Sequence, residues 1–218
     1  MEKSTLATVA LIALAFAISL YSYPAMPEMM ATHWNLSGVA NGFSGRIFGL
    51  FFLPVLSIFL FALLICLPRT DPLQENVRKN RNVYGWLVFS ILAFMSYIHL
   101  LVILWNAGFV FSMGQSISLG LAFLFYAMGL AMERLERNWF AGIRTPWAIN
   151  DDRVWKKTHY LGGKLFKACA AVAAIGSFFG EIALLLSIAS AIASAIACAI
   201  YSYLEYLKID GGKKSRKK

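Results

Sequence analysis

The residues of this sequence that could carry out chemistry lie mostly in two polar segments, residues 24–46 and residues 138–159. The first contains His33-Trp34-Asn35, but one histidine and one asparagine supply too few ligands to hold a metal tightly. Acidic residues are few and scattered, and no H-E-x-x-H, G-x-S-x-G or Walker pattern occurs. We therefore expect no enzyme active site, no bound metal and no cofactor.

The segment 138–159 is both aromatic and basic. It reads NWFAGIRTPWAINDDRVWKKTH and contains half of the six tryptophans. Indole rings sit at headgroup depth in a bilayer and cations face lipid phosphates, so this mixture is typical of a membrane–water boundary. Gly142 and Pro146 indicate a defined turn, because Pro146 fixes its own φ and biases Thr145 away from helix.

A helix is predicted to begin near the end of this segment. Asn150 can cap it, and the two aspartates that follow favour the positive helix terminus. Trp155 and His159 are four residues apart and therefore share a helix face. The helix is expected to enter the membrane near Leu161, which leaves the segment against the inner membrane surface.

Residues 24–46 are expected to form a polar loop. Pro24 and Pro27 stop the preceding helix, and several glycines and asparagines supply turns. Two interpretations of the His-Trp-Asn triplet remain open: a loop that contacts an external ligand, or a loop histidine beside an interfacial tryptophan. The candidate residues of this loop are Pro27, His33, Trp34, Asn35, Gly38, Asn41 and Gly42.

Composition indicates a membrane protein. Hydrophobic residues make up 59% of the 218 residues and charged residues only 14%, whereas soluble domains carry roughly 25% charge. The apolar residues occur in long runs, which predict an all-α integral membrane protein with six transmembrane helices. The net charge of +9 indicates anionic lipid, and no direct nucleic-acid partner, since the cations flank the apolar runs. The runs are residues 6–21, 47–67, 84–105, 116–132, 161–179 and 182–204.

The distribution of Lys and Arg predicts the orientation. All of the 20 Lys and Arg residues except Arg46 fall on the side of the two termini and of residues 138–159. Cytoplasmic segments carry the excess of positive charge, so both termini are expected to be cytoplasmic and the His33 loop external. We divide the chain into a two-span module (residues 1–67), a four-span module (68–207) and a flexible polybasic tail (208–218).

Two ionisable residues are candidates for intramembrane polar sites. His99 lies inside the third apolar run, where it is either a proton site or a neutral histidine hydrogen-bonded to a neighbouring helix. Glu181 lies at the outer end of the fifth run, either facing a cavity or in a polar turn. A four-residue repeat in the last run aligns small residues on one face, which predicts a packing seam within the bundle or in a homodimer. The seam consists of Ser190, Ser194, Cys198 and Ser202.

A specific pattern of residue types covers positions 138–162. It consists of Asn138, Trp139, Gly142, Ile143, Arg144, Thr145, Pro146, Trp147, Val154, Trp155, Thr158, His159 and Gly162. This pattern resembles the SdpI family of bacterial immunity membrane proteins, and the His-Trp-Asn loop is similar to a small domain of unknown function often found ahead of it. The resemblance implies a protein of the prokaryotic plasma membrane that protects the cell from a secreted toxic (SDP-like) peptide. It also implies signalling to a cytoplasmic transcription regulator.

A mechanism follows as a hypothesis. The toxic peptide would bind the outer loop or the outer halves of the helices, and the inner pattern would change its exposure in response. Arg144 is the inner residue expected to matter most, because its rigid fork can hold lipid phosphate, a helix carboxylate or loop carbonyls. Pro146 and Trp147 would fix its position.

Two alternative functions remain open. A small transporter would place His99, Asn106 and Glu181 near a polar path, although no inverted repeat is visible in the sequence. A membrane enzyme or lipid-binding protein would need His33 to act together with the inner residues, from which ~30 Å of hydrocarbon separates it in the predicted topology.

Overall fold

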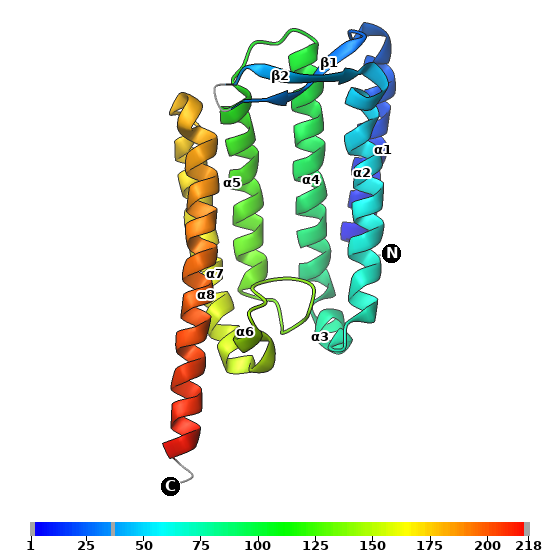
Figure 1. Ribbon diagram of the computed structural model, residues 1–218. Coiled ribbons are helices and arrows are strands. Elements are labelled where there is room, and N and C mark those ends of the chain that lie inside the picture. The colour runs from blue at the N-terminus through cyan, green and yellow to red at the C-terminus, as the bar shows by residue number, and fades with distance from the viewer. Residues whose placement is uncertain (1–2, 36–37, 216–218) are drawn as a thin grey trace.

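The computed structural model of this chain describes residues 3–35 and 38–215, which are mostly helical. Six long helices run antiparallel within these residues (Figure 1). A two-stranded hairpin covers one end of the bundle, which is called the hairpin end. The short helices α3 and α6 lie at the opposite end, which is called the α6 end (Figure 1). The long helices are α1 (Lys3–Ser22), α2 (Arg46–Cys66), α4 (Arg81–Asn106), α5 (Met113–Met132), α7 (Asp152–Gly176) and α8 (Ala183–Ser215). The short elements are η1 (Tyr23–Ala25), β1 (Met29–Trp34), β2 (Ala40–Gly45), η2 (Leu67–Thr70), α3 (Gln74–Lys79), α6 (Pro146–Asn150) and η3 (Gly180–Ile182).

Five of the six long helices are long and apolar enough to cross a membrane, and α7 is the exception. Its first two-thirds carry Lys156, Lys157, Lys164 and Lys167, and charged side chains are costly in hydrocarbon. Lys167 pairs with Glu133, which follows α5, so the charged part of α7 lies toward the α6 end. The apolar remainder packs against α5 and α8.

The polar segment 24–46, which was expected to be a loop, forms an antiparallel hairpin; the described chain is otherwise mostly helical, consistent with the predicted all-α class. Asn35 organises the turn: its Oδ1 accepts the N–H of Val39 at 2.9 Å, and Gly38 adopts a φ of +74°. Ala31 pairs with Phe43, and the register then shifts at His33. The irregular register interrupts the alternation of side chains by which a strand is recognised in a sequence.

Asn106 fixes the hairpin to the end of α4. Its side-chain amide donates to Ala31 O at 3.0 Å, and its Oδ1 accepts the N–H of Ala31 at 2.8 Å, as a neighbouring strand would. Trp34 packs edge-to-face on Trp105 with ring centroids 5.4 Å apart. Met30 is fully buried against α2 and α4. The hairpin is therefore part of the packed structure.

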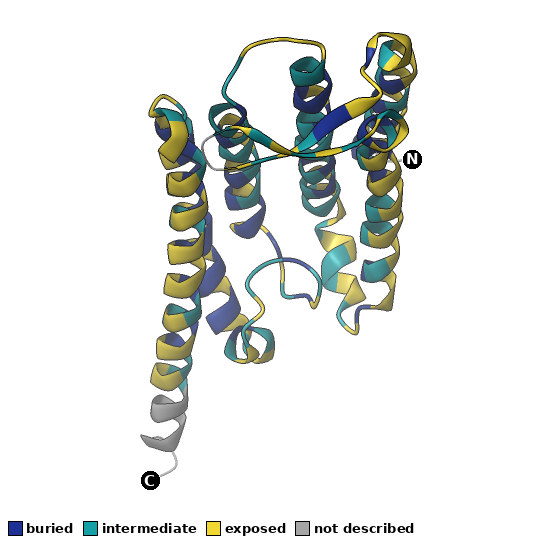
Figure 2. Cartoon of the chain, turned by 45° about the horizontal axis from the view of Figure 1, so that its top comes forward, coloured by how far each residue is buried: buried dark blue, intermediate teal, exposed yellow. Residues whose placement is uncertain are grey.

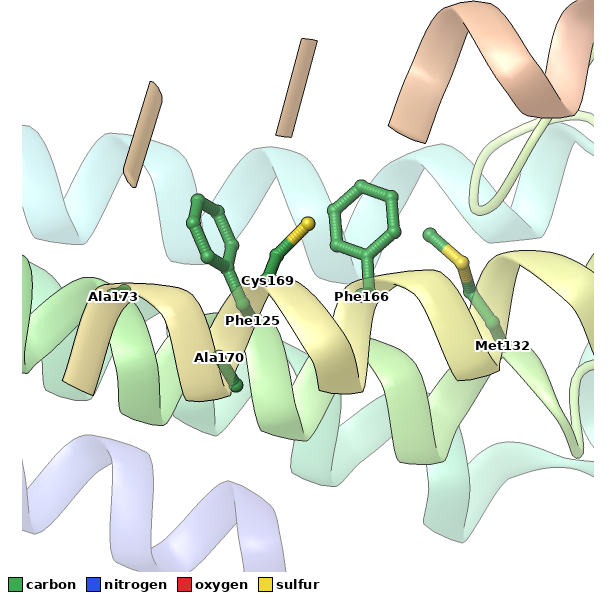
Figure 3. Packing of buried hydrophobic residues seen from close by; sticks show 6 residues of the cluster. All are labelled: Phe125, Met132, Phe166, Cys169, Ala170 and Ala173. Carbon is green, nitrogen blue, oxygen red and sulfur yellow. The ribbon is translucent and has the colours of Figure 1, made fainter. Parts of the chain in front are cut away.

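The core of the second half of the chain lies between α5 and α7 and is covered by α8. The rings of Phe125 and Phe166 pack edge-to-face at 5.9 Å. Gly129 and Gly163 allow α5 and α7 to approach closely, because a Cβ on Gly163 would lie only 2.9 Å from Gly129 O. Figure 3 shows the buried cluster, which consists of Phe125, Met132, Phe166, Cys169, Ala170 and Ala173.

Helix α8 buries Ser187, Ser194, Cys198 and Ser202 and exposes the isoleucines of its repeat. Ser194 is buried, with its Oγ 3.1 Å from Cys169 Sγ on α7, whereas Ile196 is 55% exposed. Exposed residues accordingly run along the outer face of α8 (Figure 2). The predicted seam is confirmed, and it lies within the bundle. The helix continues to Ser215, so the first eight residues of the predicted tail are helical; residues 216–218 lie outside the described residues.

Candidate functional site

Residues 138–147, which lie between α5 and α6 and include the first two residues of α6, are called the motif loop, and Asn138 begins it. Asn138 is buried, and its Oδ1 accepts the N–H groups of Phe140 at 2.9 Å and of Ala141 at 2.7 Å. Its Nδ2 donates to Glu136 O at 2.9 Å. An asparagine side chain that bonds the backbone in this way replaces a backbone turn. Asn138 thus sets the path of the loop.

Asp71 joins the motif loop to the segment between α2 and α3. Only 2% of this residue is exposed. Its Oδ2 accepts the N–H of Trp139 at 2.8 Å, and its Oδ1 accepts the N–H of Leu73 at 2.7 Å. Sequence reasoning missed Asp71. The one signal for it was an aspartate directly before Pro72 in a short connection, a pattern that favours a turn but names no distant partner.

His159 lies under the motif loop and holds it with both ring nitrogens. Its Nε2 accepts the N–H of Ile143 at 3.0 Å, so Nδ1 carries the proton and donates to Trp155 O at 3.0 Å. The ring is buried, and this burial lowers the pKa of His159 to about 4, against a smaller opposite effect of the Trp155 carbonyl. Gly142 has a φ of +102°, and a Cβ there would overlap His159 Nε2. The loop therefore requires glycine at this position.

The face of α7 under the loop is the one that the sequence predicted. The rings of Trp155 and His159 stack at 3.8 Å, and Trp155 Nε1 donates to Leu135 O at 2.8 Å. Val154 and Thr158 are fully buried, and the hydroxyl of Thr158 makes no hydrogen bond to any described residue. Gly162 is buried against Ile143. Trp155 thus bonds the chain just before the motif loop, at Leu135, and His159 bonds the loop itself, at Ile143.

The carboxy-terminal part of the loop binds α8. Thr145 Oγ1 accepts the N–H of Ala148 at 3.2 Å and thereby caps α6, in which Pro146 is the first residue. The same Oγ1 lies 2.8 Å from Ser202 Oγ on α8. Trp147 packs against Tyr203 with ring centroids 4.9 Å apart. Helix α6 is in this way fixed to the seam of α8.

Arg144 is exposed, and its Nη1 donates to Trp139 O at 2.8 Å. Lipid phosphate, a helix carboxylate and loop carbonyls were the expected partners of its guanidinium, and the structure shows a loop carbonyl. Arg137, which sequence reasoning did not single out, is more strongly held: its Nε donates to Asp152 Oδ1 and its Nη1 to Ile149 O, both at 2.6 Å. Trp139 is 46% exposed beside Arg144. Together with Pro146, these two side chains are the exposed part of the motif loop.

The cap of α7 is Asp151, one residue beyond the predicted Asn150. Asp151 Oδ1 accepts the N–H of Arg153 at 2.8 Å, whereas Asn150 Nδ2 donates to Pro146 O. The hydrogen bond from the Arg153 side chain lowers the pKa of Asp151 to about 2. A second unpredicted acid, Glu205 on α8, is buried and accepts from Lys157 and Lys208, each at 2.6 Å. It joins the start of α7 to α8.

The hairpin holds the other candidate site. His33 Nδ1 lies 2.6 Å from Asn41 Oδ1 on the paired strand, and Gly42 lies directly against the His33 side chain. Pro27, which precedes the hairpin, is exposed and accepts from Arg46 Nε at 3.3 Å. Trp34 Nε1 is buried but makes no hydrogen bond to a described residue.

A cavity of about 360 Å³ lies beneath this hairpin, between α2, α4 and α5. His33 and Trp34 lie at its hairpin side, and its remaining lining is almost entirely apolar. Phe48, Phe52 and Ile98 are among the apolar residues. Cavities of this size with one or two polar groups are typical of ligand sites.

His99 is buried at the junction of α1, α2 and α4. Pro54 has no N–H and leaves the carbonyl of Leu50 without its helical donor. The hydroxyl of Ser19 lies 2.7 Å from that carbonyl and donates to it, and His99 Nε2 lies 2.9 Å from Ser19 Oγ. His99 therefore bonds to a neighbouring helix, although its Nδ1 makes no bond to a described residue.

The residues of the transporter alternative do not meet. The amide of Asn106 is occupied by the hairpin, Glu181 is exposed in the turn of η3, and His99 bonds to Ser19. The residues of the enzyme alternative are likewise separated. His33 lies at the hairpin end, whereas Arg144 and His159 lie at the α6 end (Figure 1).

Comparison with known proteins identifies two regions of the chain. Residues 10–58 match a domain of unknown function (DUF1648), and residues 134–202 match the SdpI/YfhL protein family. The immunity protein SdpI of Bacillus subtilis (strain 168) is 24% identical over 212 residues, which cover 97% of this chain and 100% of that protein. No solved structure matches the chain. The predicted resemblance is therefore confirmed: this membrane protein is similar to the SdpI/YfhL family, whose pattern lies in the motif loop and the helices that hold it.

Proposed function

We propose that this chain is an immunity protein of the bacterial cell membrane that protects the cell from a secreted toxic peptide. The observation that carries the proposal is the similarity, over nearly the whole length of both chains, to a protein named for immunity. The apolar helices of the chain and the match of the motif loop to the same family support it.

The proposed topology has six spans with both termini in the cytoplasm. Helix α1 begins and α8 ends toward the α6 end (Figure 1). That end also carries the Arg and Lys residues of the connecting segments, which favours the cytoplasm. The apolar part of α7 would complete the sixth span, with its lysines at the inner membrane surface.

The cavity beneath the hairpin is the proposed site for the peptide. It faces the outside in this topology, and its apolar lining suits hydrophobic side chains of a membrane-active peptide. Trp34 Nε1 is a buried donor without a bonded partner in the described chain, and a peptide carbonyl could accept from it.

Helix α2 offers a route from this site to the motif loop. Its Gly49 lines the cavity and contacts Met30 of the hairpin, and its carboxy-terminal extension leads to Asp71, which binds Trp139 N. A peptide that binds one position of α2 more tightly than another would shift the loop, since only differential binding shifts an equilibrium. The accessible Trp139 and Arg144 would then present this change to a cytoplasmic transcription regulator.

The test is survival of a toxin-sensitive bacterium that expresses this chain and is challenged with an SDP-type killing peptide. We expect protection by the wild type, loss of protection in Trp34→Phe, and full protection in Phe43→Ala, an exposed hairpin residue outside the cavity lining. Membrane levels of the variants are matched. Absence of protection by the wild type against several such peptides contradicts the immunity function; protection kept in Trp34→Phe moves the peptide away from this cavity.

The signalling role has its own readout. A transcriptional reporter for the regulator should respond to peptide in the wild type and fail to respond in Arg144→Ala, while survival is retained. Loss of survival together with the reporter would show instead that the motif loop acts in protection itself.

A further inference from the structure

A second cavity, of about 380 Å³, lies at the α6 end and takes no part in the proposed immunity mechanism. Residues of helices α1, α2, α3 and α4 line it. Phe61 and Ile65 of α2 and Val88 of α4 give it an apolar interior. Arg69 of η2, Arg78 of α3 and Arg81 of α4 form a basic rim.

Two of these charges, those of Arg69 and Arg78, are accessible to an anion. The side chain of Arg69 is exposed and forms no hydrogen bond or ion pair with the other described residues. Arg78 pairs with Glu75 at 2.8 Å, but the two side chains are 75% and 68% exposed, so water weakens this pair. Among the described residues that line the cavity, none is acidic.

The apolar interior extends along the membrane-spanning helices. Helices α1, α2 and α4 are all long and apolar enough to cross a bilayer, and Phe61 and Val88 lie within α2 and α4. The hydroxyl of Tyr84 donates to Leu64 O at 2.8 Å and ties α4 to α2 beside the cavity. A small soluble anion would contact only the rim. A molecule with an anionic head and an apolar chain matches both parts.

We propose that this cavity binds one anionic phospholipid. Its phosphate lies between Arg69 and Arg78, and one acyl chain lies along Phe61, Ile65 and Val88. Planar guanidinium groups suit phosphate, and basic pockets between membrane helices hold acidic headgroups. The assignment rests neither on the immunity function nor on which end of the bundle is cytoplasmic.

The test uses the full chain purified in neutral detergent, with native mass spectrometry and thermal unfolding in the presence of phosphatidylglycerol or phosphatidylcholine. We expect one tightly retained phosphatidylglycerol, and a larger rise of the unfolding midpoint with this lipid than with phosphatidylcholine. The double variant Arg69→Gln/Arg78→Gln should bind phosphatidylglycerol about tenfold more weakly and lose the difference between the two lipids. Val77→Trp, which fills the cavity from α3 and keeps its charges, should do the same.

The matched control is Lys79→Gln/Lys156→Gln, which removes the same charge from two exposed residues outside the cavity. It should retain the lipid difference. If the control loses as much binding as the arginine variant, the attraction belongs to the surface as a whole and the site is refuted. If glycerol phosphate alone raises the midpoint as much as phosphatidylglycerol does, the ligand is a soluble anion and the lipid assignment is wrong.

Discussion

At the scale of single residues, His159 is the group on which the motif loop depends. It is neutral because Nε2 must accept from Ile143 N while Nδ1–H donates to Trp155 O, and protonation would place a second N–H against the first donor. Gly142 leaves room for this contact, with a φ that other residues adopt only at a cost. The loop and the histidine therefore form one unit.

Gly142→Ala should break this unit. The added Cβ overlaps His159 Nε2 and the φ of +102° is unfavourable for alanine, so the free energy of unfolding should fall by about 3 kcal/mol. Thermal unfolding in detergent measures it. Gly180→Ala is the control, because Gly180 also has a positive φ, +65°, but has open space around its Cβ position. An equal loss in both variants would mean that the His159 contact contributes nothing.

The stability of the protein should depend on pH through His159. Its pKa is about 4 in the folded protein and 6.5 ordinarily, so the unfolded chain binds more protons between these values. The free energy of unfolding should be highest above pH 6.5 and fall by about 3 kcal/mol on acidification toward pH 4. His159→Gln, which can accept from Ile143 N but does not titrate here, should flatten this dependence. An unchanged pH profile in that variant would assign the dependence to other groups.

Only some of the contacts of the motif residues could be predicted from the sequence. Trp155 and His159 were correctly placed on one face because helical spacing fixes that. Their partners Ile143 N and Leu135 O are backbone groups, which carry no sequence signal. Arg144 was the inner residue expected to matter most, whereas Arg137, to which no role was assigned, makes the shorter hydrogen bond.

At the scale of elements, short connections bring the two halves of the chain together. The connection from α2 to α3 touches the motif loop through the buried carboxylate of Asp71, and Asn76 Nδ2 donates to Arg137 O nearby at 2.9 Å. The seam of α8 could be predicted, because a four-residue repeat is a local property of the sequence. The contact of Asp71 with Trp139 could not, since 68 residues separate them.

Asp71→Ala should release the motif loop. It leaves the N–H of Trp139 without its acceptor, and hydrogen bonds to charged groups contribute about 1.5–3 kcal/mol. Limited trypsin digestion should therefore cut faster after Arg144, which is exposed in that loop. Glu75→Ala removes a nearby acid whose ion pair is exposed, and its cleavage rate should match the wild type. Equal acceleration in the two variants would contradict a specific role of Asp71.

At the scale of the whole molecule, the number of spans depends on α7. Alternation of six long helices follows from the sequence, because each apolar run is bounded by a polar turn. Whether α7 spans the membrane does not follow from the sequence, because its lysines make it too polar to lie alone in lipid. Its apolar part packs against α5 and α8, and Lys167 pairs with Glu133, so neighbouring helices bury part of α7 and neutralise one of its lysines.

Labelling of single cysteines in intact cells decides whether α7 crosses the membrane. Cysteine at Val110, which is fully exposed at the hairpin end, should react with a membrane-impermeant maleimide, and cysteine at Trp139 should not. Cysteine at Glu181, between α7 and α8, should react as Val110 does, because a spanning α7 returns the chain to the outside. Cys66, exposed near the α6 end, is first replaced by serine. If α7 remained on the cytoplasmic side, cysteine at Glu181 would be protected, and cysteine at Lys208, in the last part of α8, would be labelled from outside. Labelling at Glu181 together with protection at Lys208 establishes six spans, because α8 then carries the chain back.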